Sequence, residues 1–171
     1  MTNSLTDIIS ENLTIVFCGI NPGLKSAVDG HHFSGRSNRF WRVLYLAGFT
    51  RHEIEALDDQ TLLEYSYGLT TAVERPTTKA DELSKEEFSM ALAGFSQKIK
   101  TYKPRCIAFL GKAGYCAFSG KKNIGWGLQD DRFEGYIVWV LPNPSGLNRG
   151  FSLGALAAAY EEMRMYFNAL N

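Results

Sequence analysis

The chain has 171 residues, about the length of one domain, of which 45% are hydrophobic and 21% are charged. This composition predicts a single globular domain over residues 1–171 with a sizeable core. The formal net charge is zero, so the chain as a whole carries no electrostatic sign of a nucleic-acid partner. A DNA-binding function would need a local basic face.

The cysteine and histidine patterns argue against covalent cross-links and metal centres. Cys18, Cys106 and Cys116 are odd in number and apolar in setting, which disfavours a disulfide framework, and they form no C-x-x-C pair. The adjacent His31 and His32 are poorly spaced to share a metal ion. No apolar stretch approaches the roughly 20 residues that span a bilayer, and no signal-peptide pattern is present. These patterns predict a cytoplasmic protein with no membrane association.

The N-terminal region begins with an apolar, β-branched run over 13–20, which is typical of a buried parallel strand. The tripeptide Asn21-Pro22-Gly23 ends this strand in a turn. Residues 28–38 have the composition of a loop. Ser37 or Asn38 can cap the helix that follows, which has apolar residues at helical spacing.

The middle of the chain is expected to form short helices near 53–57 and 61–65, and then a second strand over 67–73. Ser84 and Glu87 have the spacing of a capping box, so a helix is expected to begin there. Its apolar face is formed by Phe88, Ala91, Leu92, Phe95 and Ile99.

The C-terminal region predicts a third buried strand over 105–110, a short helix over 113–118 and a fourth strand over 136–141. Ser152 can cap a last helix with one inward apolar face. Strands that alternate with helices indicate an α/β domain, and we expect its central sheet to be mainly parallel and four-stranded.

Two unusual loops follow the first and last of these strands, "GINPGL" and "PNPSGLNR". Sites in parallel sheets form beyond the carboxyl ends of the strands, so both loops are expected at the same edge. Asn21 in the first loop has two interpretations. It is either a turn residue before proline, or an amide that positions water without accepting its proton. The second interpretation suits N-glycosidic cleavage, whose transition state resembles an oxocarbenium ion.

Other residues also allow a structural and a functional interpretation. The loop "PNPSGLNR" is either a capped turn, or a wedge in which Leu147 and Arg149 enter a base stack. Phe33 is either a core residue or a platform for a flipped pyrimidine. Arg39 and Arg42 form either a solvated helix face or part of a phosphate-contacting patch. The other basic residues of such a patch are Lys25, Arg36, Lys121, Lys122 and Arg149.

The segments "GINPG", "NRFW" and "NPSGLNR" together resemble the mismatch-specific uracil-DNA glycosylases and the related thymine-DNA glycosylases. The likeness runs from about residue 13 to the final helix, and it includes "YGLTTAVERPT", "LSKEEF", "YKPRCIAFLGK" and "WVLPNPSG". It implies a three-layer α/β/α sandwich with no metal and no cofactor. The implied partner is double-stranded DNA with a mismatched or damaged pyrimidine, and we expect a monomer.

The resemblance also implies which residues bind and process the base. Asn21 matches the water-positioning asparagine of the family, and Phe33 matches the aromatic residue that stacks on the extruded base. Backbone groups of Ile20 and Phe33 would read the edge of the pyrimidine. Asn143 and Ser145 fit a supporting role for phosphate or loop geometry.

Contacts with the DNA helix are implied in the same way. Gly146, Leu147 and Arg149 match the loop that enters the helix, with Leu147 as the plug. Lys25 stands where many relatives are expected to have a small or apolar residue, and it would strengthen a phosphate contact.

The implied reaction is hydrolysis of the N-glycosidic bond in G:U or G:T mismatches, which releases the base and leaves an abasic site. Uracil, halogenated uracils and ethenocytosine would be good substrates and thymine a slow one. The motif has no amine nucleophile, so the enzyme would be monofunctional. Three alternatives stay open: a nucleoside hydrolase on the same scaffold, a non-catalytic binder of damaged DNA, and a small-molecule-binding α/β module.

Overall fold

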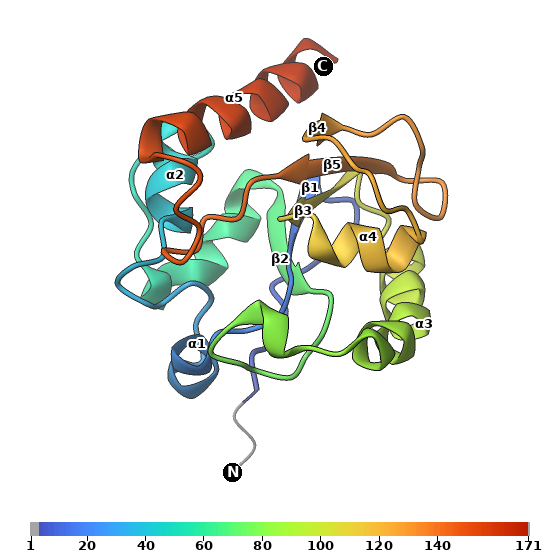
Figure 1. Cartoon of the computed structure of the whole chain (residues 1–171). Coiled ribbons are helices and arrows are strands. Elements are labelled where there is room, and N and C mark those ends of the chain that lie inside the picture. The colour runs from blue at the N-terminus through green and yellow to red at the C-terminus, as the bar shows by residue number, and fades with distance from the viewer. Residues whose placement is uncertain (1–3, 171) are drawn as a thin grey trace.

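The computed structural model describes residues 4–170 as a five-stranded sheet with helices on both faces (Figure 1). The strands are β1 (Ile15–Gly19), β2 (Tyr67–Thr71), β3 (Cys106–Leu110), β4 (Gly127–Leu128) and β5 (Ile137–Leu141). Their order in the sheet is β2-β1-β3-β5-β4. β1 is parallel to β2 and β3, and β3 is parallel to β5, while the edge strand β4 is antiparallel to β5. The expected fold class is confirmed.

The helical elements alternate with these strands. They are α1 (Leu24–Asp29), α2 (Phe40–Leu46), α3 (Lys85–Tyr102), α4 (Ala113–Ser119) and α5 (Leu153–Ala169), with the 3-10 helices η1 (Ala56–Tyr65) and η2 (Ala80–Glu82). The expected capping box forms at α3, where Ser84 Oγ accepts from the Glu87 amide and Glu87 Oε2 accepts from the Ser84 amide. Ser152 caps α5 through the Ala155 amide.

Three expectations about secondary structure are wrong in detail. The sheet has five strands rather than four, because the two residues of β4 are too few to produce a sequence pattern. The loop expected over 28–38 begins two residues later, since α1 continues to Asp29 and ends at Gly30 in the left-handed conformation. The first of the two short helices, expected near 53–57, begins only at Ala56, and it is joined across a kink at Asp58 to the second, expected near 61–65, to make up the 3-10 element η1.

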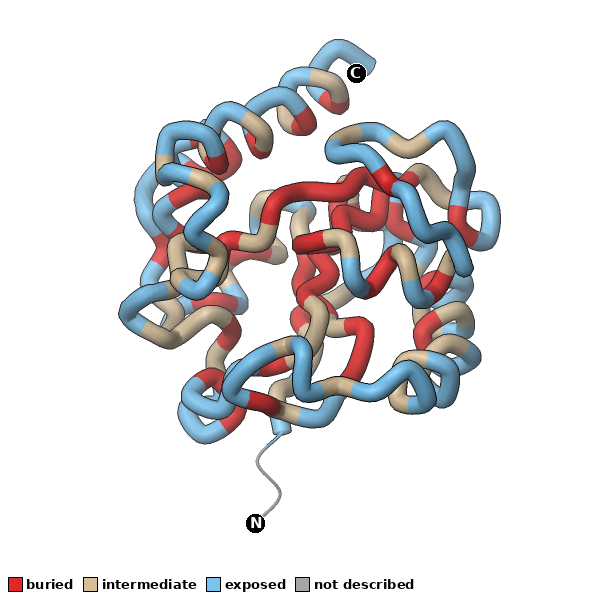
Figure 2. The backbone as a smooth tube through the Cα atoms, in the orientation of Figure 1, coloured by how far each residue is buried: buried red, intermediate tan, exposed pale blue. Residues whose placement is uncertain are grey.

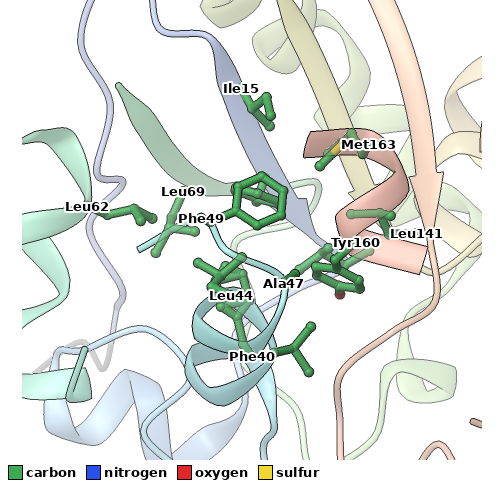
Figure 3. Close-up of a cluster of buried hydrophobic side chains, with 14 of the residues drawn as sticks. Ile15, Phe40, Leu44, Ala47, Phe49, Leu62, Leu69, Leu141, Tyr160 and Met163 are labelled. Atoms are coloured by element: carbon green, nitrogen blue, oxygen red, sulfur yellow. The ribbon is translucent and has the colours of Figure 1, made fainter. Parts of the chain in front are cut away.

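Two apolar clusters pack on the opposite faces of the sheet. In the first cluster, α2 and α5 cover one face with large side chains that interlock with the strands (Figure 3). The residues labelled there are Ile15, Phe40, Leu44, Ala47, Phe49, Leu62, Leu69, Leu141, Tyr160 and Met163. The second cluster joins α3 and α4 to the other face, through Phe95, Ile99, Tyr115 and Phe118.

Burial on both faces explains the apolar runs of β1, β3 and β5. Successive side chains of a strand point to opposite faces, so Phe17 enters the first cluster and Cys18 the second. Figure 2 shows the central strands buried, while the outer turns of the helices are exposed. No helix within residues 4–170 is long and apolar enough to cross a membrane.

Candidate active site

A cleft of about 190 Å³ opens at the carboxyl edge of the sheet. Gly19, Thr71 and Leu110, at the ends of three parallel strands, line its base, and the loop after β5 forms one wall. Eight of the nine site residues expected from sequence line this cleft. They are Ile20, Asn21, Lys25, Phe33, Asn143, Ser145, Gly146 and Leu147. The ninth, Arg149, is exposed on the same loop, outside the cleft lining.

The side-chain amide of Asn21 is held by two hydrogen bonds. Its Nδ2 donates to the Arg75 carbonyl oxygen and to Thr77 Oγ1, each at 2.8 Å. An amide nitrogen carries two hydrogens, so both are used. Asn21 Oδ1 can then accept a hydrogen bond from a water molecule in the cleft. The interpretation of Asn21 as a simple turn residue does not require this pair of contacts.

Phe33 has an unusual backbone conformation for a non-glycine residue, with a φ of 54° in the left-handed region. Such a conformation costs on the order of 1–3 kcal/mol and persists only where neighbouring contacts enforce it. On one side the Trp41 indole donates to the His32 carbonyl oxygen at 3.0 Å. On the other side the Ser34 amide donates to Ser26 Oγ at 3.2 Å.

The Phe33 ring stacks on the Phe40 ring, with centroids 4.1 Å apart and an angle of 13° between the planes. One face of Phe33 is therefore covered by the core. Phe33 also lines the cleft and is only partly buried. The two interpretations of Phe33 are thus compatible, since the residue contacts the core and also borders the cleft.

His32 and Asp59 support the loop that carries Phe33. The buried Asp59 carboxylate accepts from the His32 backbone amide at 2.9 Å, and it lies 3.3 Å from His31 Nδ1. The His32 ring is buried and its Nε2 donates to the Thr6 carbonyl oxygen at 2.8 Å. Burial lowers the pKa of the His32 imidazole below its usual value.

We predict that the free energy of unfolding falls as the pH drops below about 6.5. In that range the unfolded chain binds a proton at His32 while the folded chain still excludes it, so acid favours unfolding. Replacing His32 with glutamine should remove part of this pH dependence. Urea denaturation at about pH 7.5 and about pH 5.5 measures it, and His52→Gln at an exposed position is the matched control. Equal pH dependence in wild type and His32→Gln would contradict the prediction.

Internal hydrogen bonds shape the loop after β5. Asn143 Oδ1 accepts from the Ser145 amide at 3.0 Å, and the Asn143 carbonyl accepts from Asn148 Nδ2 at 2.9 Å. Ser145 Oγ accepts from the Leu147 amide at 3.2 Å. The polar side chains of Asn143 and Ser145 therefore organise the loop, which agrees with the supporting role expected of them.

The tip of the loop rests on the segment before α2 and presents Leu147 to solvent. A Cβ atom at Gly146 would lie 2.5 Å from Ser37 Cβ and 2.7 Å from the Ser37 carbonyl oxygen, so glycine permits this close approach. Leu147 is 64% exposed. An apolar side chain held outward on an ordered loop has the form of a wedge for a base stack.

Arg39 lies beneath this loop and not in a solvent-facing basic patch. Its guanidinium donates to the carbonyl oxygens of Pro144, Ser145, Asn148 and Phe151, at distances between 2.7 and 3.4 Å. Its backbone amide also donates to the Pro144 carbonyl at 3.0 Å. Four of its five N–H donors are therefore used within the protein, which favours a structural role for Arg39 over a phosphate contact. Lys25 is also paired, with Asp29 at 3.0 Å, but it remains exposed at the rim of the cleft.

Comparison with known proteins shows which family the chain belongs to. Residues 6–170 match the family described as the Uracil DNA glycosylase superfamily. The chain belongs to this superfamily. Its fold is also similar to the NMR solution structure of a candidate uracil DNA glycosylase from Methanosarcina acetivorans. The TM-score is 0.63 at 24% sequence identity, with 94% of this chain and 97% of that chain covered.

Superfamily membership supports a DNA glycosylase activity, with DNA as the partner. The cleft brings together Asn21, Phe33 and Leu147, the residues to which the sequence resemblance assigns water positioning, base stacking and entry into the DNA helix. Within residues 4–170 no group of three or more histidine, cysteine, aspartate or glutamate side chains is arranged to hold a metal ion.

The sequence did not indicate the structural roles of two residues that organise this uracil DNA glycosylase superfamily site. Thr77 contacts the catalytic candidate Asn21, and Arg39 anchors the loop of Leu147. Arg39 is part of the "NRFW" segment, but its type and position gave no sign that its partners lie more than 100 residues away. Thr77 follows "VERP" and had only the appearance of a polar loop residue.

Proposed function

We propose that this superfamily member is a monofunctional, mismatch-specific uracil- and thymine-DNA glycosylase that acts as a monomer in the cytoplasm. The observation that carries the proposal is the Asn21 amide, because both of its hydrogens are bonded to protein and the residue lines the cleft, which leaves the amide oxygen as the group that can hold water. An amide oxygen orients water but does not accept its proton at neutral pH. This property fits a reaction in which the leaving group departs largely before water attacks.

In the proposed mechanism, Leu147 enters the duplex and takes the place of the extruded nucleotide. A mismatched pyrimidine costs less to extrude than a paired one, so G:U and G:T pairs are favoured. The base then stacks on the open face of Phe33. Backbone groups of Ile20 and Phe33 contact the edge of the base and stabilise the negative charge that develops on it.

The chemical step breaks the bond between the anomeric carbon and the base nitrogen, and the bonding electrons leave with the base. The water held by Asn21 Oδ1 adds to the anomeric carbon, and its released proton passes to solvent or to the departing base. The products are a free base and an abasic site. Because the described residues that line the cleft include no aspartate or glutamate to stabilise a cationic sugar, the proposal favours bases that are stable as anions, namely uracil, halogenated uracils and ethenocytosine, with thymine slower.

The monofunctional assignment predicts that no lysine forms a covalent adduct with the abasic product. Lys25, the lysine in the cleft lining, is paired with Asp29, and Lys112 lies 4.5 Å above the Trp126 ring. Incubation with uracil-containing duplex and borohydride should therefore trap no protein–DNA complex. A trapped complex that disappears in Lys25→Ala or Lys112→Ala would assign a lyase activity instead.

A panel of duplexes tests the substrate range. Excess protein is incubated with labelled duplexes that carry one G:U, A:U, G:T or G:ethenocytosine pair, and alkali then cleaves the abasic sites. The proposal predicts excision from G:U at least about tenfold faster than from A:U, because extrusion of the paired base costs more. Equal rates on G:U and A:U would contradict mismatch specificity. Turnover of free nucleosides with no cleavage of duplexes would favour the nucleoside hydrolase alternative.

A further inference from the structure

The hydroxyl of Thr77 has its hydrogen-bonding direction fixed by its own partners. Thr77 Oγ1 lies 2.8 Å from the Lys79 carbonyl oxygen, which can only accept, so the single hydroxyl hydrogen points to Lys79. The oxygen therefore presents a lone pair to Asn21, also at 2.8 Å. Asn21 must meet this lone pair with its nitrogen and not with its oxygen.

The Arg75 carbonyl oxygen imposes the same orientation from a second direction, since it also lies 2.8 Å from Asn21 Nδ2. If the amide were flipped, Asn21 Oδ1 would face a carbonyl oxygen and a hydroxyl lone pair, with no hydrogen between them. The two acceptors together fix the amide nitrogen toward Arg75 and Thr77, so the amide oxygen is the atom left for other partners.

Thr77 is also tied firmly to the turn that carries Asn21. It is 4% exposed, and its backbone amide donates to the Pro22 carbonyl at 3.1 Å. A β-bridge joins Thr77 to Gly23. The segment is held from the other side by Arg75, whose guanidinium pairs with Glu87 at the start of α3. Thr77 therefore keeps a fixed distance from Asn21.

We propose that Thr77 is a positioning residue that holds the Asn21 amide with its oxygen toward the attacking water. This inference rests on the proposed function, because the value of the orientation lies in the water that it places. Thr77 itself contacts neither base nor sugar in this account. Its hydroxyl acts through Asn21.

The first test compares Thr77→Val with Thr77→Ser in single-turnover excision from a G:U duplex. Valine keeps the shape of threonine but offers no lone pair, whereas serine keeps the hydroxyl. We expect Thr77→Val to lower the excision rate by about tenfold, the scale of one oriented hydrogen bond, while duplex affinity stays within about twofold. Thr77→Ser should recover most of the rate. A wild-type rate in Thr77→Val, or equal losses in both variants, would overturn the proposal.

A double-mutant cycle separates positioning from a general structural role. If Thr77 acts through Asn21, Thr77→Val should cause no further loss in an Asn21→Ala background. A loss of the same factor in both backgrounds would show that Thr77 supports the cleft in another way. Melting temperatures establish that the variants fold, and Thr77→Ala replaces Thr77→Val if valine prevents folding.

A nuclear magnetic resonance measurement tests the orientation without any activity. In the wild-type protein, the two side-chain amide protons of Asn21 should be resolved and protected from exchange with water. In Thr77→Val, one of them should shift and exchange faster, while Thr77→Ser keeps the wild-type pattern. Unchanged amide signals in Thr77→Val would refute the inference. Protected signals in a protein that cleaves no duplex would refute the proposed function and leave the orientation intact.

Discussion

Replacing Asn21 with alanine should lower the single-turnover rate of uracil excision by about 100-fold or more, while binding of the mismatched duplex changes little. Alanine removes the oxygen that orients the attacking water, but it leaves the Phe33 platform and the Leu147 loop in place. The rate is measured with excess protein on a labelled G:U duplex, and the affinity with an uncleavable analogue of the same duplex.

Asn123→Ala is the matched control, because Asn123 is exposed and lies outside the lining of the cleft. It should excise uracil at the wild-type rate. If Asn21→Ala also kept the wild-type rate, water positioning by Asn21 would be wrong and the residue would return to its interpretation as a turn.

The substitution Asn21→Asp tests the two hydrogen bonds that the Asn21 amide nitrogen donates, because it removes the donor and keeps an oxygen that can bind water. A carboxylate accepts hydrogen bonds as well as an amide does, but it cannot donate to the Arg75 carbonyl or to Thr77. One carboxylate oxygen would lie against the Arg75 carbonyl oxygen without a hydrogen between them. We therefore expect Asn21→Asp to be slower than wild type at neutral pH, although aspartate is the stronger base.

Replacing Arg39 with methionine should reduce excision by about 10- to 100-fold, although Arg39 is not part of the cleft lining. Its guanidinium holds four carbonyl groups of the loop that presents Leu147, and methionine can bond to none of them. The loop would then lose its order before it meets DNA, so insertion would cost more conformational entropy. Duplex affinity should fall together with the rate.

Two further variants separate loop anchoring from charge. Arg39→Lys keeps the positive charge but not the planar group of donors, so it should be nearly as impaired as Arg39→Met. Arg42→Met removes one charge from the exposed face of the same helix, and its effect should be small and dependent on salt. Full activity in Arg39→Lys would show that Arg39 contributes charge and not geometry.

The sequence predicted the elements whose pattern is local. The strands β1, β3 and β5 are buried on both faces, so each appears as an apolar run that needs no knowledge of its neighbours. The caps at Ser84 and Ser152 depend on residues three positions apart. The edge strand β4 was missed because its two residues are defined by pairing with β5 and not by their own sequence.

For the candidate site too, the sequence predicted the residues that lie in local motifs but not the long-range contacts that orient them. Asn21, Phe33 and Leu147 lie in short distinctive segments, and the expected parallel direction of the strands was enough to place two of their loops at one edge of the sheet. The contacts that orient them join distant positions. Asn21 meets Arg75 and Thr77 across 54 and 56 positions, and Arg39 meets its carbonyl partners across more than 100. No local pattern reports such pairs.

We propose that this chain hydrolyses the N-glycosidic bond of uracil in duplex DNA. To test this, excess wild-type protein is incubated with a duplex that carries one G:U pair, and both free uracil and the alkali-sensitive abasic site are detected. We expect both products to appear in equal amounts and both to be lost in Asn21→Ala. Folded wild-type protein that binds the duplex but releases no uracil would contradict the proposal, and would identify a binder of damaged DNA.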